Sequence, residues 1–158
     1  MVTPARVHGH PIHPMLVVFP IGLWVFSFVC DIVYVTAGGP LWKGAAFLTI
    51  LGGIAGAAAA AIPGFIDFWS LKSPTIFKMA LSHMALNVLA ALMFICSAFS
   101  RGVDTPYSIS MTLSAVGIVA LVFSGWLGGE LVYVRGIAVE SRGEVTGRGR
   151  RRCVGRVR

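Results

Sequence analysis

Four long apolar stretches alternate with short polar connections along the chain, over about residues 15–37, 44–66, 77–99 and 109–129. Each stretch has about 20 residues or slightly more, which suffices for a helix to cross a hydrocarbon core of about 30 Å. A helix also satisfies its backbone polar groups within its own segment, as a bilayer requires. The pattern therefore predicts four transmembrane helices.

The connections between the stretches are short and contain residues typical of turns, namely Gly38-Gly39-Pro40, Lys72-Ser73-Pro74 and Arg101-Gly102 to Thr105-Pro106. Short connections make consecutive helices antiparallel neighbours. We therefore expect an all-α polytopic membrane protein with an antiparallel four-helix transmembrane bundle. The bundle would occupy residues 15–134, between a His/Pro-rich segment at 1–14 and a basic tail at 135–158.

Two sequence features bear on how the helices pack. Small residues recur at four-residue spacing in the second and fourth stretches, at Gly52, Gly56, Ala60 and Gly64, and at Ala120, Ser124 and Gly128. Such stripes favour close helix packing, although the groove would also leave room for a flat cofactor. Pro20 has no N–H to donate to the carbonyl of residue 16, so we expect a kink in the first stretch.

Composition agrees with a membrane location, because 56% of residues are hydrophobic and 12% are charged, against about 25% charged in soluble domains. The net charge of +7 comes mainly from the tail, which holds eight arginines against two glutamates. We expect this tail to be disordered. Its position beside the membrane favours attraction to anionic lipid, at about 1 kcal/mol per arginine, over nucleic-acid binding.

The distribution of positive charge predicts the orientation of the bundle. With four spans both termini lie on one side, which also receives Arg6, Lys72 and Lys78 besides the arginines of the tail. The other side receives Lys43 and Arg101. The positive-inside rule then places both termini in the cytoplasm, and we expect the bundle to lie in an inner membrane.

Few ionisable residues lie within or beside the spans, and each is costly there unless it has a partner. They are His10, His13, Asp31, Asp67, His83 and Glu130. The predicted topology brings all of them except Asp31 to the cytoplasmic end of the bundle. Asp31 should lie near the outer surface.

Three of the four histidines, His8, His10 and His13, precede the first stretch. Pro11 and Pro14 stiffen this segment and place His13 at the start of the first helix. Neutral imidazoles at such spacing suit a transition metal or haem iron. The alternative is a surface cap that binds free backbone N–H groups or lipid phosphates.

His83 lies six residues into the third stretch, and Asn87 follows at i+4 on the same helix face. A histidine among apolar residues in lipid is expensive unless it is partnered. His83 could therefore be a cofactor ligand, with Asn87 beside it. It could equally donate a hydrogen bond to a neighbouring helix, with Asn87 completing a structural polar cluster.

Asp67 and Glu130 also have more than one interpretation. They could form interfacial ion pairs with nearby cations, the candidates being Lys72, Lys78 and Arg135. They could also serve a proton relay with His83. A metal site, as an alternative to haem, would draw on His10, His13, Asp67 and His83.

These residues resemble a known pattern. It comprises His10 to Leu16, Phe19 to Leu23 with Asp31, Gly64 with Asp67, His83 with Asn87, and Gly128 to Tyr133 with Gly136. Over about residues 8–139 the chain resembles the bacterial membrane family catalogued as domain of unknown function 2231. The tail after Arg142 has no counterpart in the pattern. The family has no settled activity.

The resemblance implies an architecture similar to the four-helix di-haem cytochrome b superfamily, in which histidines on facing helices ligate haem. Some relatives are associated with Rieske-type iron–sulfur partners, which implies electron transfer and a redox protein as partner. This chain departs from a di-haem pattern, because its histidines gather at one end. It could hold at most one haem b, with His83 facing His13 or His10.

Three functions follow from the sequence. The first is a haem or transition-metal site that passes electrons within the membrane. The second is a non-catalytic membrane subunit whose polar residues form a structural network and which binds no cofactor. The third is a small transporter or proton-conducting element. Because no nucleophile, P-loop, dinucleotide or zinc-protease motif is present, we expect no independent catalytic activity.

Overall fold

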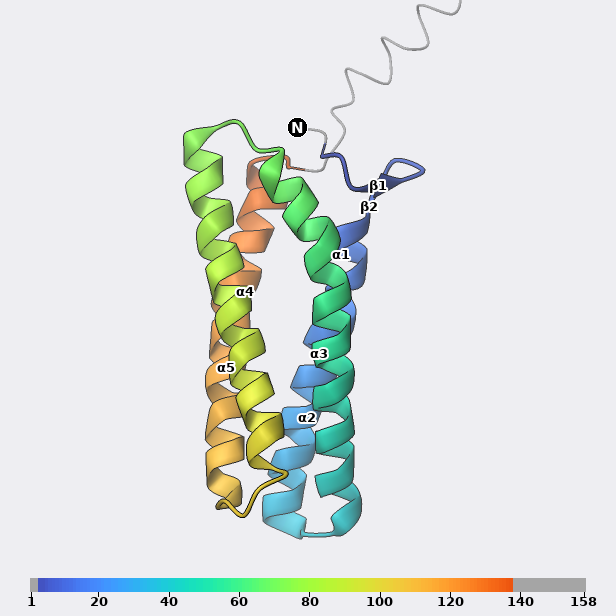
Figure 1. Cartoon of the computed structure of the whole chain (residues 1–158), viewed down its shortest axis with the longest axis vertical. Coiled ribbons are helices and arrows are strands. Elements are labelled where there is room, and N and C mark those ends of the chain that lie inside the picture. The colour runs from blue at the N-terminus through green and yellow to red at the C-terminus, as the bar shows by residue number, and fades with distance from the viewer. Residues whose placement is uncertain (1–2, 138–158) are drawn as a thin grey trace, which may run out of the picture.

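Four long antiparallel helices form the body of the molecule in the computed structural model, which describes residues 3–137 (Figure 1). They are α2 (Val18–Ala37), α3 (Pro40–Trp69), α4 (Pro74–Ser100) and α5 (Tyr107–Gly129). Four spans are long and apolar enough to cross a membrane. The predicted all-α membrane bundle is therefore confirmed, and α3 and α4 extend beyond the predicted stretches at both ends.

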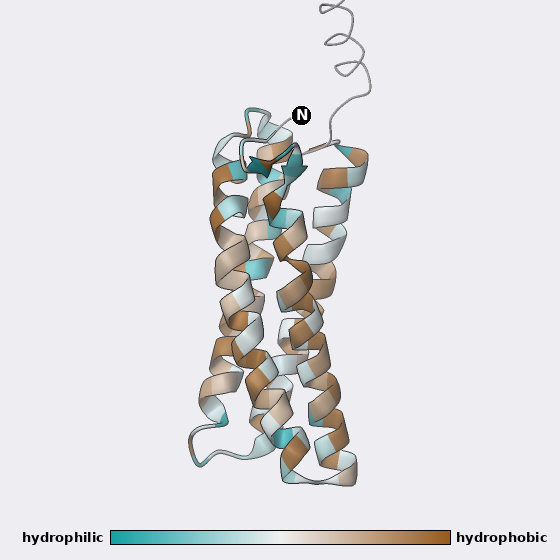
Figure 2. Ribbon diagram, turned by 90° about the vertical axis from the view of Figure 1, so that its right-hand side faces the viewer, coloured by the Kyte–Doolittle hydropathy of each residue, from teal (hydrophilic) through white to brown (hydrophobic). Residues whose placement is uncertain are grey.

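Hydrophobic residues, brown in Figure 2, recur along the whole length of the four long helices. Large exposed residues occur on each long helix, for example Phe19, Leu48, Leu92 and Phe123. In water such a surface would be unfavourable. It fits a protein whose helices are surrounded by lipid.

The first span is divided into α1 (Ile12–Leu16) and α2, with Val17 between them. The interruption directly follows Leu16, whose carbonyl would accept the N–H that Pro20 lacks. Pro20 itself is buried against α3, where a Cβ on Gly56 would lie 3.2 Å from the proline ring. The proline thus accounts for the break in the span.

A short β-hairpin precedes the bundle and was not anticipated from the sequence. Strand β1 (Arg6–Val7) pairs with β2 (His10–Pro11) through a turn at His8 and Gly9, both with positive φ. The backbone N–H of Ala5 donates to Asp67 Oδ1 at 2.9 Å, which ties this segment to the end of α3. The basic tail predicted at 135–158 lies almost wholly outside the described residues.

The buried side chains form two apolar clusters at different heights in the bundle. Trp24, Ile50 and Phe94 form the first, near the middle. The second lies where α3 ends and α4 begins, at the top of Figure 1, and consists of Phe68, Ala80 and Leu131. The helix segments between these clusters carry small and polar residues that face the bundle interior. This layer, here called the histidine layer, contains His13, His83, Asn87, Ala60, Gly64, Ser124 and Gly128.

Beyond Gly129 the last span continues as one short stretch of π-helix, η1 (Glu130–Val134). Its characteristic i to i+5 bond is made by the N–H of Arg135, which donates to the carbonyl of Glu130 at 3.0 Å. Leu131 is buried on this stretch and belongs to the second apolar cluster. The final turn therefore still packs against the bundle.

Candidate functional site

The imidazole of His13 is held against the backbone of α3. Its Nδ1 lies 2.8 Å from the carbonyl oxygen of Ala60, and because a carbonyl can only accept, Nδ1 carries the proton. One turn further along α3, a Cβ on Gly64 would lie 2.7 Å from Nδ1. Gly64 is therefore required for the ring to approach the helix. In the neutral ring, Nε2 is left with a free lone pair.

The imidazole of His83 is held against α5 in the same way. Its Nδ1 lies 2.9 Å from the carbonyl oxygen of Ser124 and 3.0 Å from the Ser124 hydroxyl. One turn further along α5, a Cβ on Gly128 would lie 3.0 Å from Cε1 of the ring. Both histidines thus combine a bond from Nδ1 to a backbone carbonyl with a glycine four residues later.

Asn87 fixes the protonation pattern of His83 from the other side. Its Nδ2 donates to the His83 carbonyl at 2.9 Å and lies 3.1 Å from His83 Nε2. Since Nδ2 carries only protons, Nε2 accepts and Nδ1 bears the ring proton. The expected pairing of His83 with Asn87 is found, and it agrees with the bond from Nδ1 to Ser124.

The two imidazoles face each other across the bundle. Their ring centroids are 6.4 Å apart and their planes are perpendicular. Two imidazoles that ligate one metal from opposite sides, at about 2.0–2.1 Å each, have centroids about 6 Å apart. The spacing of His13 and His83 would therefore allow both rings to hold one metal ion between them.

The other predicted site residues are placed elsewhere. His10 lies on the β-hairpin, where its exposed ring contacts the His8 carbonyl at 3.2 Å. Asp67 accepts the bond from Ala5. Glu130 lies 3.5 Å from Arg135, which is one of the ion pairs considered from the sequence.

These placements limit the site that the sequence suggested. Across residues 3–137 no three His, Cys, Asp or Glu residues gather in a way that could hold a metal ion. The metal set of His10, His13, Asp67 and His83 is thus not brought together. The histidine layer assembles two imidazoles and one amide, from His13, His83 and Asn87.

Comparison with known proteins places the chain in a family. Residues 9–141 match the family described as "Predicted membrane protein (DUF2231)". The chain belongs to this family. The resemblance seen in the sequence is thereby confirmed, and with four spanning helices the DUF2231 protein is a multi-pass membrane protein. No curated protein and no solved structure matches the chain.

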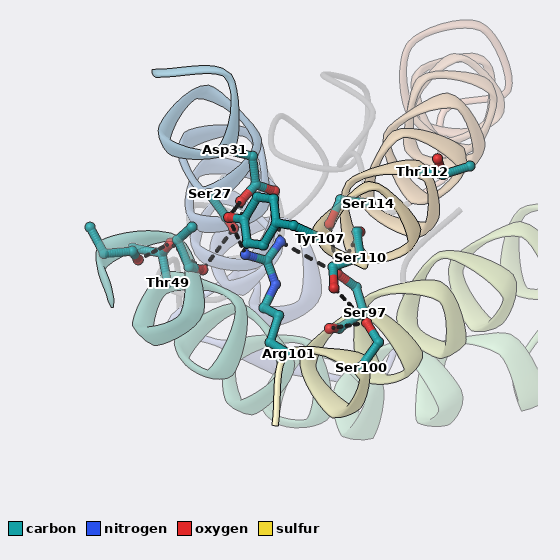
Figure 3. Close-up of polar contacts among 12 residues, drawn as sticks. Ser27, Asp31, Thr49, Ser97, Ser100, Arg101, Tyr107, Ser110, Thr112 and Ser114 are labelled. Carbon is teal, nitrogen blue, oxygen red and sulfur yellow. Dashed lines mark hydrogen bonds and ion pairs between the residues drawn. The ribbon is translucent and has the colours of Figure 1, made fainter. Parts of the chain in front are cut away.

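Sequence reasoning missed a buried ion pair at the opposite end of this DUF2231 protein. Arg101 binds Asp31 with two parallel hydrogen bonds, from Nη1 to Oδ1 at 2.8 Å and from Nη2 to Oδ2 at 2.7 Å (Figure 3). Both side chains are almost fully buried, with exposures of 3% and 0%. The sequence pattern predicts a loop at Arg101, and the contact of its side chain with Asp31 depends on how the helices pack.

Tyr107 completes this ion pair. Its hydroxyl donates to Asp31 Oδ1 at 2.6 Å and accepts from Arg101 Nη1 at 2.8 Å. Burial of the Arg101 guanidinium opposes its charge, but the adjacent Asp31 carboxylate outweighs that effect and raises the pKa of Arg101 above its usual value. Arg101 is therefore a permanent cation in this pair.

Serine hydroxyls extend the polar region from the ion pair into α4 and α5. Ser97 donates to the carbonyl of Ser110 at 2.8 Å and contacts the hydroxyl of Ser114 at 2.9 Å (Figure 3). Ser100 contacts the Ser110 hydroxyl at 2.7 Å. The cluster of Trp24, Ile50 and Phe94 lies between this region and the histidine layer, so the two polar regions are separate.

Proposed function

We propose that this DUF2231 protein holds one haem b, or less favourably one transition-metal ion, between His13 and His83 and passes electrons within the membrane. The observation that carries the proposal is the pair of perpendicular imidazoles with centroids 6.4 Å apart. Each comes from a different half of the chain, as axial ligands on facing helices do.

The hydrogen bonds of the two rings support a ligand role. A metal-binding histidine usually donates its second ring N–H to a carbonyl or carboxylate, which fixes the tautomer and orients the ring. His13 and His83 each donate from Nδ1 to a backbone carbonyl, at 2.8 and 2.9 Å. The Nε2 lone pair of each ring would then bind iron. For His83 this requires the Asn87 amide to move aside, because Asn87 Nδ2 lies 3.1 Å from His83 Nε2.

The number of protein ligands favours haem over a bare ion. Structural zinc requires four protein ligands, and the described residues supply no group of three. In haem the macrocycle provides the remaining ligands, so two histidines suffice. When bound, the iron would accept and release one electron. The protein would hold it, exclude water and set its potential through the bonds at Nδ1.

The surroundings of the rings suit a flat apolar group. The histidine layer is lined by the small residues Ala60, Gly64, Ser124 and Gly128, and the large buried side chains lie above and below it. A larger residue at either glycine would meet a histidine ring. The layer therefore combines two ligands with small neighbouring side chains.

We further propose that the histidine layer lies at the cytoplasmic end of a bacterial inner-membrane bundle with both termini in the cytoplasm. The positive charges at this end support that orientation. A redox protein, such as the Rieske-type partner implied by the family resemblance, would then bind at this end. The arginine-rich tail would contribute attraction to anionic lipid.

A visible spectrum of the detergent-purified protein, with metal analysis, tests the proposal. We expect a Soret band and one iron per chain. His13→Ala and His83→Ala should each abolish the band, whereas His10→Ala, which changes an exposed histidine of the hairpin, should retain it. A protein with no Soret band and no stoichiometric iron, zinc or copper would refute the proposal.

The contacts also favour a second function, a non-catalytic membrane subunit. His13 Nδ1, His83 Nδ1 and the Asn87 amide already have partners within the protein, as in a structural polar network. In that case function would come from a partner that co-purifies in mild detergent. His83→Ala should then lower the midpoint of thermal unfolding without any change in absorbance or metal content.

The proton relay receives less support from the contacts. Asp67 is engaged by the backbone of Ala5 and Glu130 by Arg135. Among the described residues no hydrogen bond joins either carboxylate to His83. Proton flux in liposomes that is unchanged by His83→Ala or Asp67→Ala would exclude the relay.

A further inference from the structure

Contacts in the first half of the bundle recur in the second half at a constant spacing. Residues of α1 and α2 have counterparts 70 positions later on α4. The counterparts are His13 and His83, Trp24 and Phe94, Ser27 and Ser97, and, just beyond the end of α4, Asp31 and Arg101. Two of these pairs, the histidines and the serines, keep the same residue type.

The helices that pack against them repeat as well. Residues of α3 have counterparts 64 positions later on α5, namely 46 and 110, 53 and 117, 60 and 124, and 64 and 128. All four make the same contact in both halves. Ser27 donates to the carbonyl of Ala46 at 2.8 Å, and Ser97 donates to the carbonyl of Ser110 at the same distance.

Glycines at equivalent positions make room for equivalent rings. A Cβ on Gly53 would collide with the indole of Trp24, and one on Gly117 would lie 2.8 Å from the ring of Phe94. In the histidine layer, Gly64 serves His13 and Gly128 serves His83 in the same manner. One helical hairpin is thus built twice, with the same helix-to-helix contacts.

The counterparts on α1–α2 and α4 also face each other. The His13 and His83 rings are 6.4 Å apart, the Trp24 and Phe94 rings stack at 4.4 Å, and the third such pair is the ion pair of Asp31 and Arg101. Both hairpins start at the same end of the bundle (Figure 1). A two-fold axis along the bundle places equivalent residues opposite one another in this way.

We infer that the bundle is two copies of one helical hairpin related by a pseudo-two-fold axis along the helices, and that Asp31 and Arg101 make each hairpin select the other as its partner. This goes beyond the proposed function and does not depend on a cofactor. By fixing which hairpins pair, and at what height, the ion pair would determine that His13 faces His83.

The nature of the three facing pairs supports this role. Two of the pairs, His13 with His83 and Trp24 with Phe94, join residues of the same kind. These pairs would therefore also fit if a hairpin packed against the same hairpin of a second copy of the chain. Asp31 with Arg101 would not, because such pairing sets two carboxylates or two guanidinium groups against each other in a nearly dry site. Repulsion of this kind is how interfaces reject wrong partners.

Charge reversal in the full-length protein tests the inference. Asp31→Arg and Arg101→Asp should each lower the midpoint of thermal unfolding in detergent. The double variant, which exchanges the charges between equivalent positions, should recover more than half of that loss. The matched control is Asp31→Arg with Lys72→Asp, which keeps the same net charge and reverses an exposed cation at the opposite end of the bundle instead. A double variant no more stable than this control would overturn the inference.

Selection between hairpins is tested by co-expression of two differently tagged full-length copies. One copy carries Asp31→Arg and the other Arg101→Asp, so opposite charges can meet only between the copies. We expect the two tags to co-purify from this mixture, and not from two wild-type copies or from two Asp31→Arg copies. If both copies are present in the membrane and fail to co-purify, the ion pair does not select partners.

Discussion

The indole of Trp24 stacks on the phenyl ring of Phe94, with ring centroids 4.4 Å apart and planes inclined by 10°. Together with Ile50 the two rings form an apolar layer across the bundle. The histidine layer lies on one side of it and the ion pair of Asp31 and Arg101 on the other. The two polar regions are therefore isolated from each other. This separation agrees with a site near one side of the membrane and argues against a continuous polar path through it.

The equivalence of Trp24 and Phe94 leads to an exchange experiment. Trp24→Phe removes volume and the indole bond to the Ile50 carbonyl at 3.3 Å, and Phe94→Trp adds volume in a packed layer. Each should cost about 1–3 kcal/mol in the free energy of unfolding. The double exchange should cost less than the sum, because Gly117 leaves room beside position 94 as Gly53 does beside position 24.

Denaturant unfolding of the four proteins, followed by helical circular dichroism, gives the coupling free energy of this exchange. The control is an exchange at lipid-facing Val25 and Ile95, namely Val25→Ile with Ile95→Val. It should change the free energy of unfolding very little, since both side chains are exposed. Strictly additive costs for the Trp24 and Phe94 changes would contradict the equivalence of the two positions.

The two glycines of the histidine layer lead to a second prediction. A Cβ at Gly64 would lie 2.7 Å from His13 Nδ1, and a Cβ at Gly128 would lie 3.0 Å from His83 Cε1. Alanine at either position should displace the ring and destabilise the protein by about 1–3 kcal/mol. Gly22→Ala and Gly125→Ala are the matched controls, because nothing lies within 4 Å of their Cβ positions.

The measurement is the midpoint of thermal unfolding in detergent, with the visible spectrum recorded in parallel. If the protein binds haem, Gly64→Ala and Gly128→Ala should also weaken the Soret band. Alanine variants as stable as the two controls would show that the rings have more freedom than the contacts indicate.

Asp67 leads to a third prediction, which concerns the segment before the bundle. Its carboxylate accepts the N–H of Ala5, and Ala5 and Thr3 are both buried. Asp67→Ala leaves that N–H without its acceptor, at a cost of about 1–3 kcal/mol. Asp67→Asn retains an oxygen at the same place and should cost less.

Amide hydrogen exchange of residues 3–11 measures this effect locally. We expect faster exchange in Asp67→Ala, with the long helices unchanged. Glu130→Ala serves as the control, since Glu130 lies at the same end of the bundle but pairs with Arg135 and not with the segment before α1. Equal exchange in Asp67→Ala and the wild type would show that other contacts hold the hairpin.

Several features of the site could be anticipated from the residues, because they follow from chain direction and helix periodicity. The antiparallel order brings the start of the first and third spans to one end, so His13 and His83 meet there. Asn87 lies one turn from His83 and shares its face. By this reasoning His10 and Asp67 belong to the same end. In the structure, however, His10 lies on the exposed β-hairpin, and Asp67 accepts a hydrogen bond from the backbone of Ala5, just before the hairpin.

The sequence by itself determined that the chain crosses a membrane four times, since apolar length and backbone hydrogen bonding leave a single solution in lipid. It also determined which end holds the histidines. The tertiary structure decided the partners of each polar group: Ala60 and Ser124 for the rings, and Arg101 for Asp31. These choices depend on the rotation and height of each helix against its neighbours, which small residues at the contacts set and which periodicity along one helix does not contain.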